Sequence, residues 1–159
     1  MLKVLFVCLG NICRSPTAHA VFRDMAKQQG VDVEVESAGT SAYHQGALPD
    51  KRSQSVGLSR GYRFDGIYSR PVKDSDFAYY DRIYAMDMQN LHDLKQRCPA
   101  EYQHKLLLFL QHHPDFHLTR EVPDPYYGGV RGFERVLDLI EQGALALLEE
   151  LQRKHVRNG

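Results

Sequence analysis

The sequence predicts a single α/β domain, residues 1–159, built on a four-stranded parallel sheet with helices on both faces. Three observations predict it. Short apolar runs rich in β-favouring residues alternate along the chain with segments of helical periodicity, which is the order of strands joined by crossover helices. No repeat, low-complexity segment or linker divides the 159 residues. The first apolar run also ends in a Cys-x5-Arg-Ser loop that opens a helix, a place where open α/β sheets bind ligands.

Leu2–Val7 is the first of these apolar runs and reads as a buried strand. Pro16 then opens a segment with helical periodicity, and proline is favoured at the first position of a helix. Gly30 is placed to end that helix. Cys8 therefore lies where a strand ends, a short loop turns and a helix begins.

The next segments continue the alternation. Valines and acidic residues alternate over 31–36, as in a half-buried strand, and 37–41 is a loop of small residues. Residues 49–60 read as a helix, with Val56 and Leu58 as its core contacts.

A long connection over 62–73 leads to a short helix over 74–80 and a third strand over 82–85. Asp87 follows at the carboxyl end of that strand. Because parallel strands end at the same sheet edge, Asp87 is expected beside Cys8, and it also suits the N-cap of a helix over 89–97.

Residues 106–109 predict a fourth buried strand, and apolar residues spaced by three and four over 133–151 predict a long amphipathic helix that covers the sheet. Between them lie His112, His113 and His117. Their spacing in a proline-containing loop gives no regular ligand face, so a solvated loop is expected there and no metal site.

The composition argues against several classes of function. Lys plus Arg and Asp plus Glu each total 20, so the formal net charge is zero and no broad basic surface for nucleic acid is expected. No apolar run is long enough to span a bilayer, and no charged-then-apolar leader precedes the first strand, so no membrane contact is expected. Three cysteines without paired or metal-ligand spacing predict a reduced, cytoplasmic protein.

The loop between Cys8 and Ser15 predicts an anion site that carries a nucleophile. Its backbone N–H groups and the helix N-terminus attract an anion, and the planar guanidinium of Arg14 suits phosphate oxygens. The same groups favour the thiolate of Cys8, which is placed to attack phosphorus. Ser15 is expected to hydrogen-bond the sulfur. The alternative, an ordinary buried thiol and a surface arginine, explains less of the pattern.

A second chemical motif lies late in the chain. Pro123 and Pro125 stiffen the backbone on either side of Asp124 and present its carboxyl group. Transfer of a phosphoryl group from a phenol needs a proton for the departing oxygen, and Asp124 fits that role of general acid. Tyr126 and Tyr127 are expected to stack on an aromatic substrate, although core packing is an alternative for one of them.

The stretch Val7–Pro16 and the Asp124–Tyr127 motif together resemble the low-molecular-weight protein tyrosine phosphatases, and the resemblance covers the whole chain. It implies hydrolysis of phosphotyrosine in proteins, and of small aryl phosphates, through a cysteinyl-phosphate. It implies no cofactor and no metal ion. Its partners would be phosphotyrosine-containing proteins, with phosphate or other oxyanions in the loop, and the protein would be a monomer or a weak homodimer.

The resemblance also implies a set of site residues. Cys8, Arg14 and Asp124 are catalytic; Leu9, Gly10, Asn11, Ile12, Cys13, Ser15, Tyr43, Tyr126 and Tyr127 bind substrate; Ser37 and Asp87 support the site. Relatives often carry a histidine at the position of Ile67 that braces the loop, so this chain departs from the pattern there. Arg70 aligns with a basic residue of the family, but a solvated side chain is expected.

Other functions on the same fold stay open. Relatives that act on phosphoarginine commonly have Thr where this chain has Ile12, which favours phosphotyrosine. Arsenate reductases use two further cysteines in the later half of the chain, where only Cys98 lies. A catalytically silent phosphate-binding module would be expected to lack the thiol or the acid. Relatives with a cysteine like Cys13 can form a reversible disulfide with the nucleophile, so redox sensitivity is predicted; packing under the loop is the alternative.

Overall fold

The computed structural model describes residues 1–126 and 129–158, with side chains up to Lys154. Its sheet has four parallel strands in the order β2-β1-β3-β4. This confirms the predicted α/β fold. The strands are β1 (Leu2–Cys8), β2 (Val33–Gly39), β3 (Arg82–Ala85) and β4 (Leu106–Leu108).

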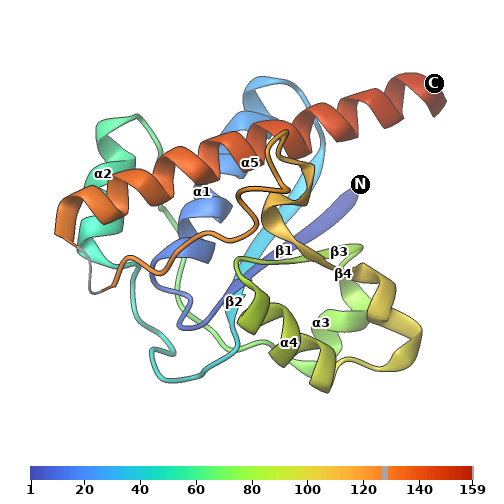
Figure 1. The fold of residues 1–159 in the computed structure, drawn as a ribbon, viewed down its shortest axis with the longest axis horizontal. Helices are drawn as coiled ribbons and strands as arrows, with labels where there is room; N and C mark the ends of the chain where they lie inside the picture. The colour runs from blue at the N-terminus through green and yellow to red at the C-terminus, as the bar shows by residue number, and fades with distance from the viewer. Residues whose placement is uncertain (127–128, 159) are drawn as a thin grey trace.

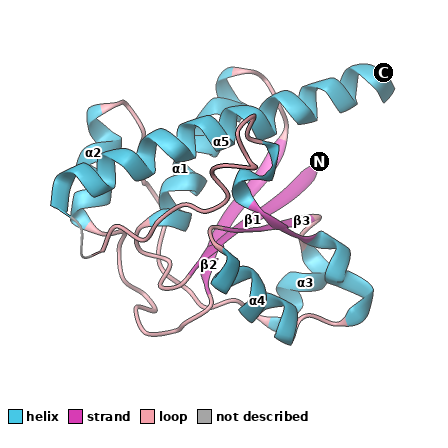
Figure 2. Ribbon diagram, in the orientation of Figure 1, coloured by secondary structure: helices cyan, strands magenta, loops and turns pink. Residues whose placement is uncertain are grey.

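Helices cover both faces of the sheet (Figure 1, Figure 2). The long α5 lies over α1 on one face with α2 at its side, while α3 and α4 lie on the other. The helices are α1 (Arg14–Gln28), α2 (Lys51–Ser59), α3 (Asp74–Tyr79), α4 (Met88–Arg97) and α5 (Gly129–Asn158), with two short 3-10 helices, η1 (Ala100–Lys105) and η2 (Phe109–His112), on either side of β4.

Strand β1 shows why the sheet needs two layers of helices. Val4 and Phe6 belong to the cluster under α1 and α5, whereas Leu5 and Val7 belong to the cluster under α3 and α4. All four are fully buried. A strand buried on both faces reads as a continuous apolar run, which is how this segment stands out in the sequence.

The strand order explains where the site lies. From β1 the chain moves to β2 on one side and then crosses to β3 on the other, so the crevice outside the carboxyl ends of β1 and β3 lies where the winding reverses. Open α/β sheets bind ligands at this switch point. Cys8 ends β1, and Asp87 follows β3 after one residue.

Some predicted boundaries differ from the structure. Helix α1 begins at Arg14 rather than Pro16, β2 continues through the small residues to Gly39, and Phe109 starts a 3-10 helix instead of ending β4. Leu58 is 54% exposed, so its predicted core contact is wrong. Val56 packs against the core, as predicted. Helix α2 also packs through Gly57, whose missing side chain leaves room for the ring of Phe64.

The histidine loop also differs from the prediction. His112 Nε2 lies 3.1 Å from the hydroxyl of Tyr84, and His113 Nε2 lies 2.7 Å from Gln142 Oε1 on α5. The loop is therefore tied to the sheet and to α5 rather than solvated throughout. The described residues hold no cluster of three or more metal-ligating side chains, and no helix among them is both long and apolar enough to cross a membrane.

Candidate active site

The phosphate loop, residues 8–15, is held in shape by its own asparagine. Asn11 has φ +55°, the only positive value among the non-glycine residues that the structure describes. Asparagine tolerates this left-handed conformation better than most residues. Its Nδ2 donates to Ser15 Oγ at 2.8 Å, and its Oδ1 accepts from the backbone N–H of Arg70 at 3.0 Å. The side chain thus links both halves of the turn to the neighbouring segment.

Carbonyl groups of the phosphate loop point outward, toward hydrogen-bond donors in the surrounding protein. No described residue accepts a hydrogen bond from the N–H groups of residues 9–13, so these donors are available for a ligand. A ring of N–H groups with outward carbonyls is an anion-binding nest. The outward bonds are Thr40 N to the Cys8 carbonyl, Ser41 N to Leu9, Ser69 Oγ to Gly10, Asp50 N to Ile12, and Thr17 N and Oγ1 to Cys13, at 2.6–3.3 Å.

Gly39 permits the close approach of β2 to this loop. A Cβ atom at this position would lie 2.8 Å from the Leu9 carbonyl oxygen, 3.0 Å from that of Ser41 and 3.2 Å from Asn11 Cβ. Backbone atoms cannot move away cheaply, so any larger residue would displace the loop.

Cys8 lies at the bottom of the loop and is 2% exposed. Its Sγ lies 3.0 Å from Ser15 Oγ and accepts from the Ser15 N–H at 3.4 Å. Ser15 itself is fully buried at the start of α1. The sulfur is therefore surrounded by donors at a helix N-terminus, an environment that stabilises negative charge.

Arg14 is 3% exposed and is fixed by two partners. Its Nη1 donates to Asp87 Oδ2 at 2.6 Å and to the Val122 carbonyl at 3.0 Å. Burial opposes the charged guanidinium, but Cys8 and the hydrogen-bonded Asp87 outweigh it, so the pKa of Arg14 is raised and the cation persists. Asp87 Oδ1 also accepts from the Asn90 N–H, which caps α4. The Asp87 carboxylate thus both pairs with Arg14 and caps α4.

Asp124 lies opposite the phosphate loop. Its Oδ2 is 3.8 Å from Arg14 Nη2, and its side chain is 47% exposed. Its Oδ1 accepts from the Tyr126 N–H at 3.0 Å, the hydrogen bond of an Asx turn. The carboxyl group is therefore held near the arginine while one side stays open to solvent.

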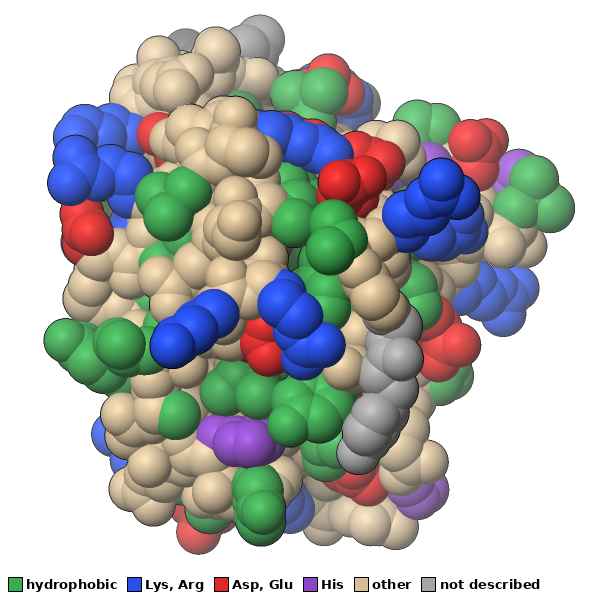
Figure 3. Space-filling view, turned by 90° about the vertical axis from the view of Figure 1, so that its left-hand side faces the viewer, with side chains coloured by type: hydrophobic (Ala, Val, Ile, Leu, Met, Phe, Trp, Pro, Cys, Tyr) green, Lys and Arg blue, Asp and Glu red, His purple; other side chains and the backbone are tan. Residues whose placement is uncertain are grey.

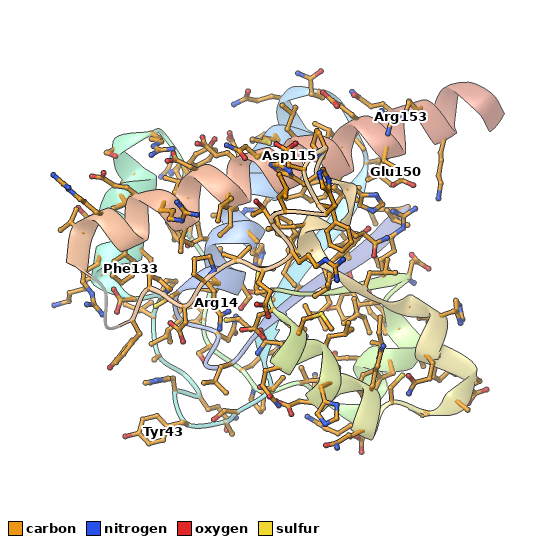
Figure 4. All side chains as sticks on the ribbon, in the orientation of Figure 1. Arg14, Tyr43, Asp115, Phe133, Glu150 and Arg153 are labelled. Carbon is orange, nitrogen blue, oxygen red and sulfur yellow. The ribbon has the colours of Figure 1, made fainter. Side chains whose placement is uncertain are left out.

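These residues enclose one pocket of about 470 Å³. Tyr43, 87% exposed, marks one rim, and Tyr126, 38% exposed, marks another. Arg14 lies near the centre of the molecule, while Tyr43 projects from the far end of its loop (Figure 4). The pocket-lining residues are Cys8, Leu9, Gly10, Ile12, Cys13, Arg14, Ser41, Tyr43, His44, Asp124 and Tyr126.

Most of the predicted site residues come together in this pocket, with five exceptions. Asp87 does not line the pocket and instead contacts Arg14, at 2.6 Å. Asn11 and Ser15 are buried behind the loop, where they shape it. Ser37 Oγ lies 3.0 Å from His19 Nδ1, so its described side-chain contact is with α1 rather than with the loop. Tyr127 lies outside the described residues.

Sequence reasoning missed His44, which lines the pocket next to Tyr43. Its ring stands edge-on to that of Tyr43, with centroids 4.8 Å apart. A Cβ atom at Gly10 would lie 3.0 Å from His44 Cδ2, so the ring packs on the backbone of the phosphate loop. Its position directly after a predicted wall residue was the one available signal.

The bracing of the loop was missed as well. Ile67 is 2% exposed and packs with Ala20 and Phe64, so the position where relatives often have histidine is apolar here. The segment after it braces the loop through the Ser69 hydroxyl and the Arg70 N–H. The Arg70 side chain was predicted to be solvated, but it is partly buried and pairs with Asp76 at 2.9 Å.

Cys13 is a second thiol of the loop and is 5% exposed. Burial, aided by the nearby Asp50 carboxylate, raises its pKa to about 12, so it is protonated at neutral pH. All three cysteines are free thiols. A reversible disulfide between Cys8 and Cys13 therefore stays a prediction.

The chain is similar in sequence and in structure to known tyrosine phosphatases. Residues 3–157 match the family model "Low molecular weight phosphotyrosine protein phosphatase". The low molecular weight protein-tyrosine-phosphatase YfkJ of Bacillus subtilis is 39% identical over 156 residues, which cover 97% of this chain and 98% of that protein. The human low molecular weight phosphotyrosine protein phosphatase is 40% identical, with 93% and 94% covered. A crystal structure of protein tyrosine phosphatase from Entamoeba histolytica superposes with a TM-score of 0.92 at 44% identity, covering 98% and 99% of the two chains.

Proposed function

The chain belongs to the low molecular weight phosphotyrosine protein phosphatase family, and on this basis we propose that it hydrolyses phosphotyrosine in proteins through a cysteinyl-phosphate. One observation carries the proposal. Cys8, Arg14 and Asp124 line one pocket together with loop residues whose backbone N–H groups have no acceptor among the described residues.

In the first step, the Cys8 thiolate attacks phosphorus and a P–S bond forms as the P–O bond to the tyrosyl oxygen breaks. Asp124, in its acid form, gives its proton to the departing oxygen. The loop N–H groups and Arg14 bind the equatorial oxygens and stabilise their charge in the transition state. Ser15, 3.0 Å from the sulfur, is placed to stabilise it again when it leaves.

In the second step, water attacks phosphorus. Asp124, now a carboxylate, takes a proton from this water, the P–S bond breaks, and inorganic phosphate and the thiolate are released. Arg14 and the loop donors supply the electrostatic stabilisation that a metal ion supplies in other phosphatases, so the proposed reaction uses none.

The depth of the pocket favours an aryl phosphate. Cys8 is 2% exposed at the bottom of the pocket, while Tyr43 and Tyr126 are exposed at its rim. A phosphate on a long, flat aromatic side chain reaches the sulfur and leaves its ring between the two tyrosines. Phosphoserine is shorter and offers no ring to stack. On the face of the molecule that lies to the left in Figure 1, hydrophobic side chains and a histidine lie below a group of charged side chains (Figure 3).

The experiment is release of p-nitrophenol from p-nitrophenyl phosphate in the presence of a metal chelator, with wild type and Cys8→Ser. We expect turnover by wild type, loss of turnover by at least about 10⁴-fold in the variant, and retained binding of phosphate by the variant. Substantial activity of Cys8→Ser would contradict the covalent mechanism.

Rates of hydrolysis of phosphorylated peptides distinguish between the possible substrate classes. A phosphotyrosyl peptide should be hydrolysed much faster than phosphoseryl and phosphoarginyl peptides of the same sequence. Faster hydrolysis of the phosphoarginyl peptide would support the alternative that Ile12 argues against. Phosphate binding without any turnover would indicate a silent binding module.

A further inference from the structure

Arg52 is held in an unusual position beside the pocket. Asp50 caps α2 by accepting from the Arg52 N–H at 2.8 Å, and the same carboxylate accepts from Arg52 Nε at 3.1 Å and from Nη2 at 3.0 Å. Two bonds from a planar guanidinium to one carboxylate fix the orientation of the plane. The side chain is 43% exposed, yet it is not free to swing through solvent.

The fixed guanidinium lies against two aromatic rings from different elements. Its Cζ is 4.5 Å from the ring centroid of Phe133, on the buried side of α5, and 5.4 Å from that of Tyr126, on the pocket rim. Both distances lie within the range of cation–π attraction. Arg52 therefore ties Tyr126 to α2 and α5.

Asp50 and Tyr126, the two residues that contact the Arg52 side chain near the pocket, are each bonded to one of its walls. On one side, the Asp50 N–H donates to the Ile12 carbonyl of the phosphate loop at 2.8 Å. On the other side, the Tyr126 N–H donates to Asp124 Oδ1. A continuous series of contacts thus joins the phosphate loop to the carboxyl group that is proposed to supply the proton.

We propose that Arg52 is a positioning residue. It holds Tyr126 in place, and through Tyr126 it fixes the position of the Asp124 carboxyl group relative to the phosphate loop. This inference rests on the proposed function, because it assigns Arg52 a part in the proton transfer from Asp124. Arg52 is not among the residues that line the pocket, so we assign it a role through Tyr126 rather than on the reacting atoms. Its effect should appear only where the proton from Asp124 limits the rate.

The experiment compares kcat/KM for phenyl phosphate, which has a poor leaving group, with kcat/KM for p-nitrophenyl phosphate, which has a good one. In Arg52→Ala the phenyl to p-nitrophenyl ratio should fall about fivefold, the size of one exposed cation–π contact. Arg52→Lys keeps the charge but loses the planar fork, so its ratio should lie between those of Arg52→Ala and wild type.

Lys51→Ala is the matched control, because it removes one positive charge from the adjacent, exposed position of the same helix. Its ratio should equal that of wild type. In a Tyr126→Ala background, Arg52→Ala should no longer change the ratio, since the contact through which it acts is gone.

An Arg52→Ala variant that slows both substrates equally, or that matches Lys51→Ala, would overturn the proposal. The wild-type rate on p-nitrophenyl phosphate reports separately on the proposed function, so the two can fail independently. Thermal unfolding of each variant identifies a general loss of stability, which would lower both rates without changing their ratio.

Discussion

The phosphate loop and the acid loop, residues 122–126, face each other across one pocket but are built differently. Cys8, Arg14 and Ser15 are each at most 3% exposed, and the carbonyls beside them are bonded to several other segments. Asp124 and Tyr126 lie largely at the surface, and the carboxylate has one short backbone hydrogen bond. The phosphate loop is thus buried and bonded to the segments around it, whereas the acid loop is partly exposed to solvent.

This difference in exposure matches the two tasks of the proposed mechanism. Stabilising charge on phosphate oxygens requires donors that are already in place and do not reorganise. Supplying a proton and later activating water requires a group that both substrate and solvent can reach. Variants in the phosphate loop should therefore affect all substrates alike, whereas variants in the acid loop should discriminate between leaving groups.

The largest effect is expected from Asp124→Ala. Loss of the general acid should lower kcat/KM for phenyl phosphate by about 10²–10⁴-fold, and that for p-nitrophenyl phosphate much less, because nitrophenolate leaves without a proton. Kinetics on a series of aryl phosphates measures this. Asp115→Ala, an exposed aspartate outside the pocket, is the control. A uniform loss across the series would mean that Asp124 has only a structural role.

Asp87→Asn tests the opposite wall. The amide can still cap α4, but it removes the charge that holds Arg14. A hydrogen bond to a charged group is worth about 1.5–3 kcal/mol, so kcat/KM should fall about 10–100-fold for every leaving group. Affinity for phosphate should weaken in parallel. Glu121→Gln is the matched control, because Glu121 accepts from the Met88 N–H on the same helix. If the fall in kcat/KM of Asp87→Asn varies with the leaving group, the phosphate loop and the acid loop do not have the separate roles proposed for them.

Gly39→Ala should distort the phosphate loop without removing any functional group. The added methyl would meet backbone oxygens at 2.8 and 3.0 Å, and overpacking of this kind costs about 1–3 kcal/mol. We expect a lower free energy of unfolding in urea together with weaker phosphate binding. Gly129→Ala provides the same change where a Cβ meets nothing within 4 Å. Unchanged phosphate affinity in Gly39→Ala would show that the loop tolerates movement.

The smallest effect on activity is expected at His19, a buried residue of α1. Burial, with Arg23 and Arg70 nearby, lowers the pKa of His19 to about 3, against about 6.5 in an unfolded chain. Between these values the unfolded state binds the extra proton, so His19 makes the fold less stable as pH falls through this window, by at most about 1.4 kcal/mol per pH unit.

His19→Gln keeps a hydrogen-bonding side chain for Ser37 but cannot take up this proton. Urea unfolding at several pH values should therefore give a flatter decline for the variant than for wild type between about pH 6 and pH 4. Parallel curves would show that His19 does not titrate on unfolding. The rate on p-nitrophenyl phosphate at pH 7 should change little.

The sequence predicted well the features that follow from the order of strands and helices along the chain. Alternating elements imply parallel strands, and parallel strands bring Cys8 and the residues after β3 to one edge, so the meeting of Arg14 with Asp87 was foreseeable. Asp124 was predicted from chemistry, since the proposed reaction needs an acid, and its carboxyl group lines the same pocket as Cys8.

Contacts between surface segments that lie far apart in the sequence could not be predicted from chain order or from local sequence patterns. Nothing in the local sequence shows that Arg52 meets Phe133, 81 positions later, or that the Asp50 N–H reaches the phosphate loop. The prediction for Leu58 failed because its helix packs through Val56 and Gly57, which leaves Leu58 on the exposed side. The prediction for Arg70 failed because its partner, Asp76, lies in a different element.

The outward carbonyls of the phosphate loop have a consequence for the whole molecule. N–H dipoles that converge on one point repel each other, so a bound oxyanion relieves a tension that the folded chain otherwise carries and that the unfolded chain lacks. By thermodynamic linkage, an anion at a hundred times its dissociation constant adds about 2.7 kcal/mol to the free energy of unfolding. The melting temperature of this protein should therefore rise with the concentration of inorganic phosphate, the product of its proposed reaction, and the composition of the buffer becomes a determinant of its stability.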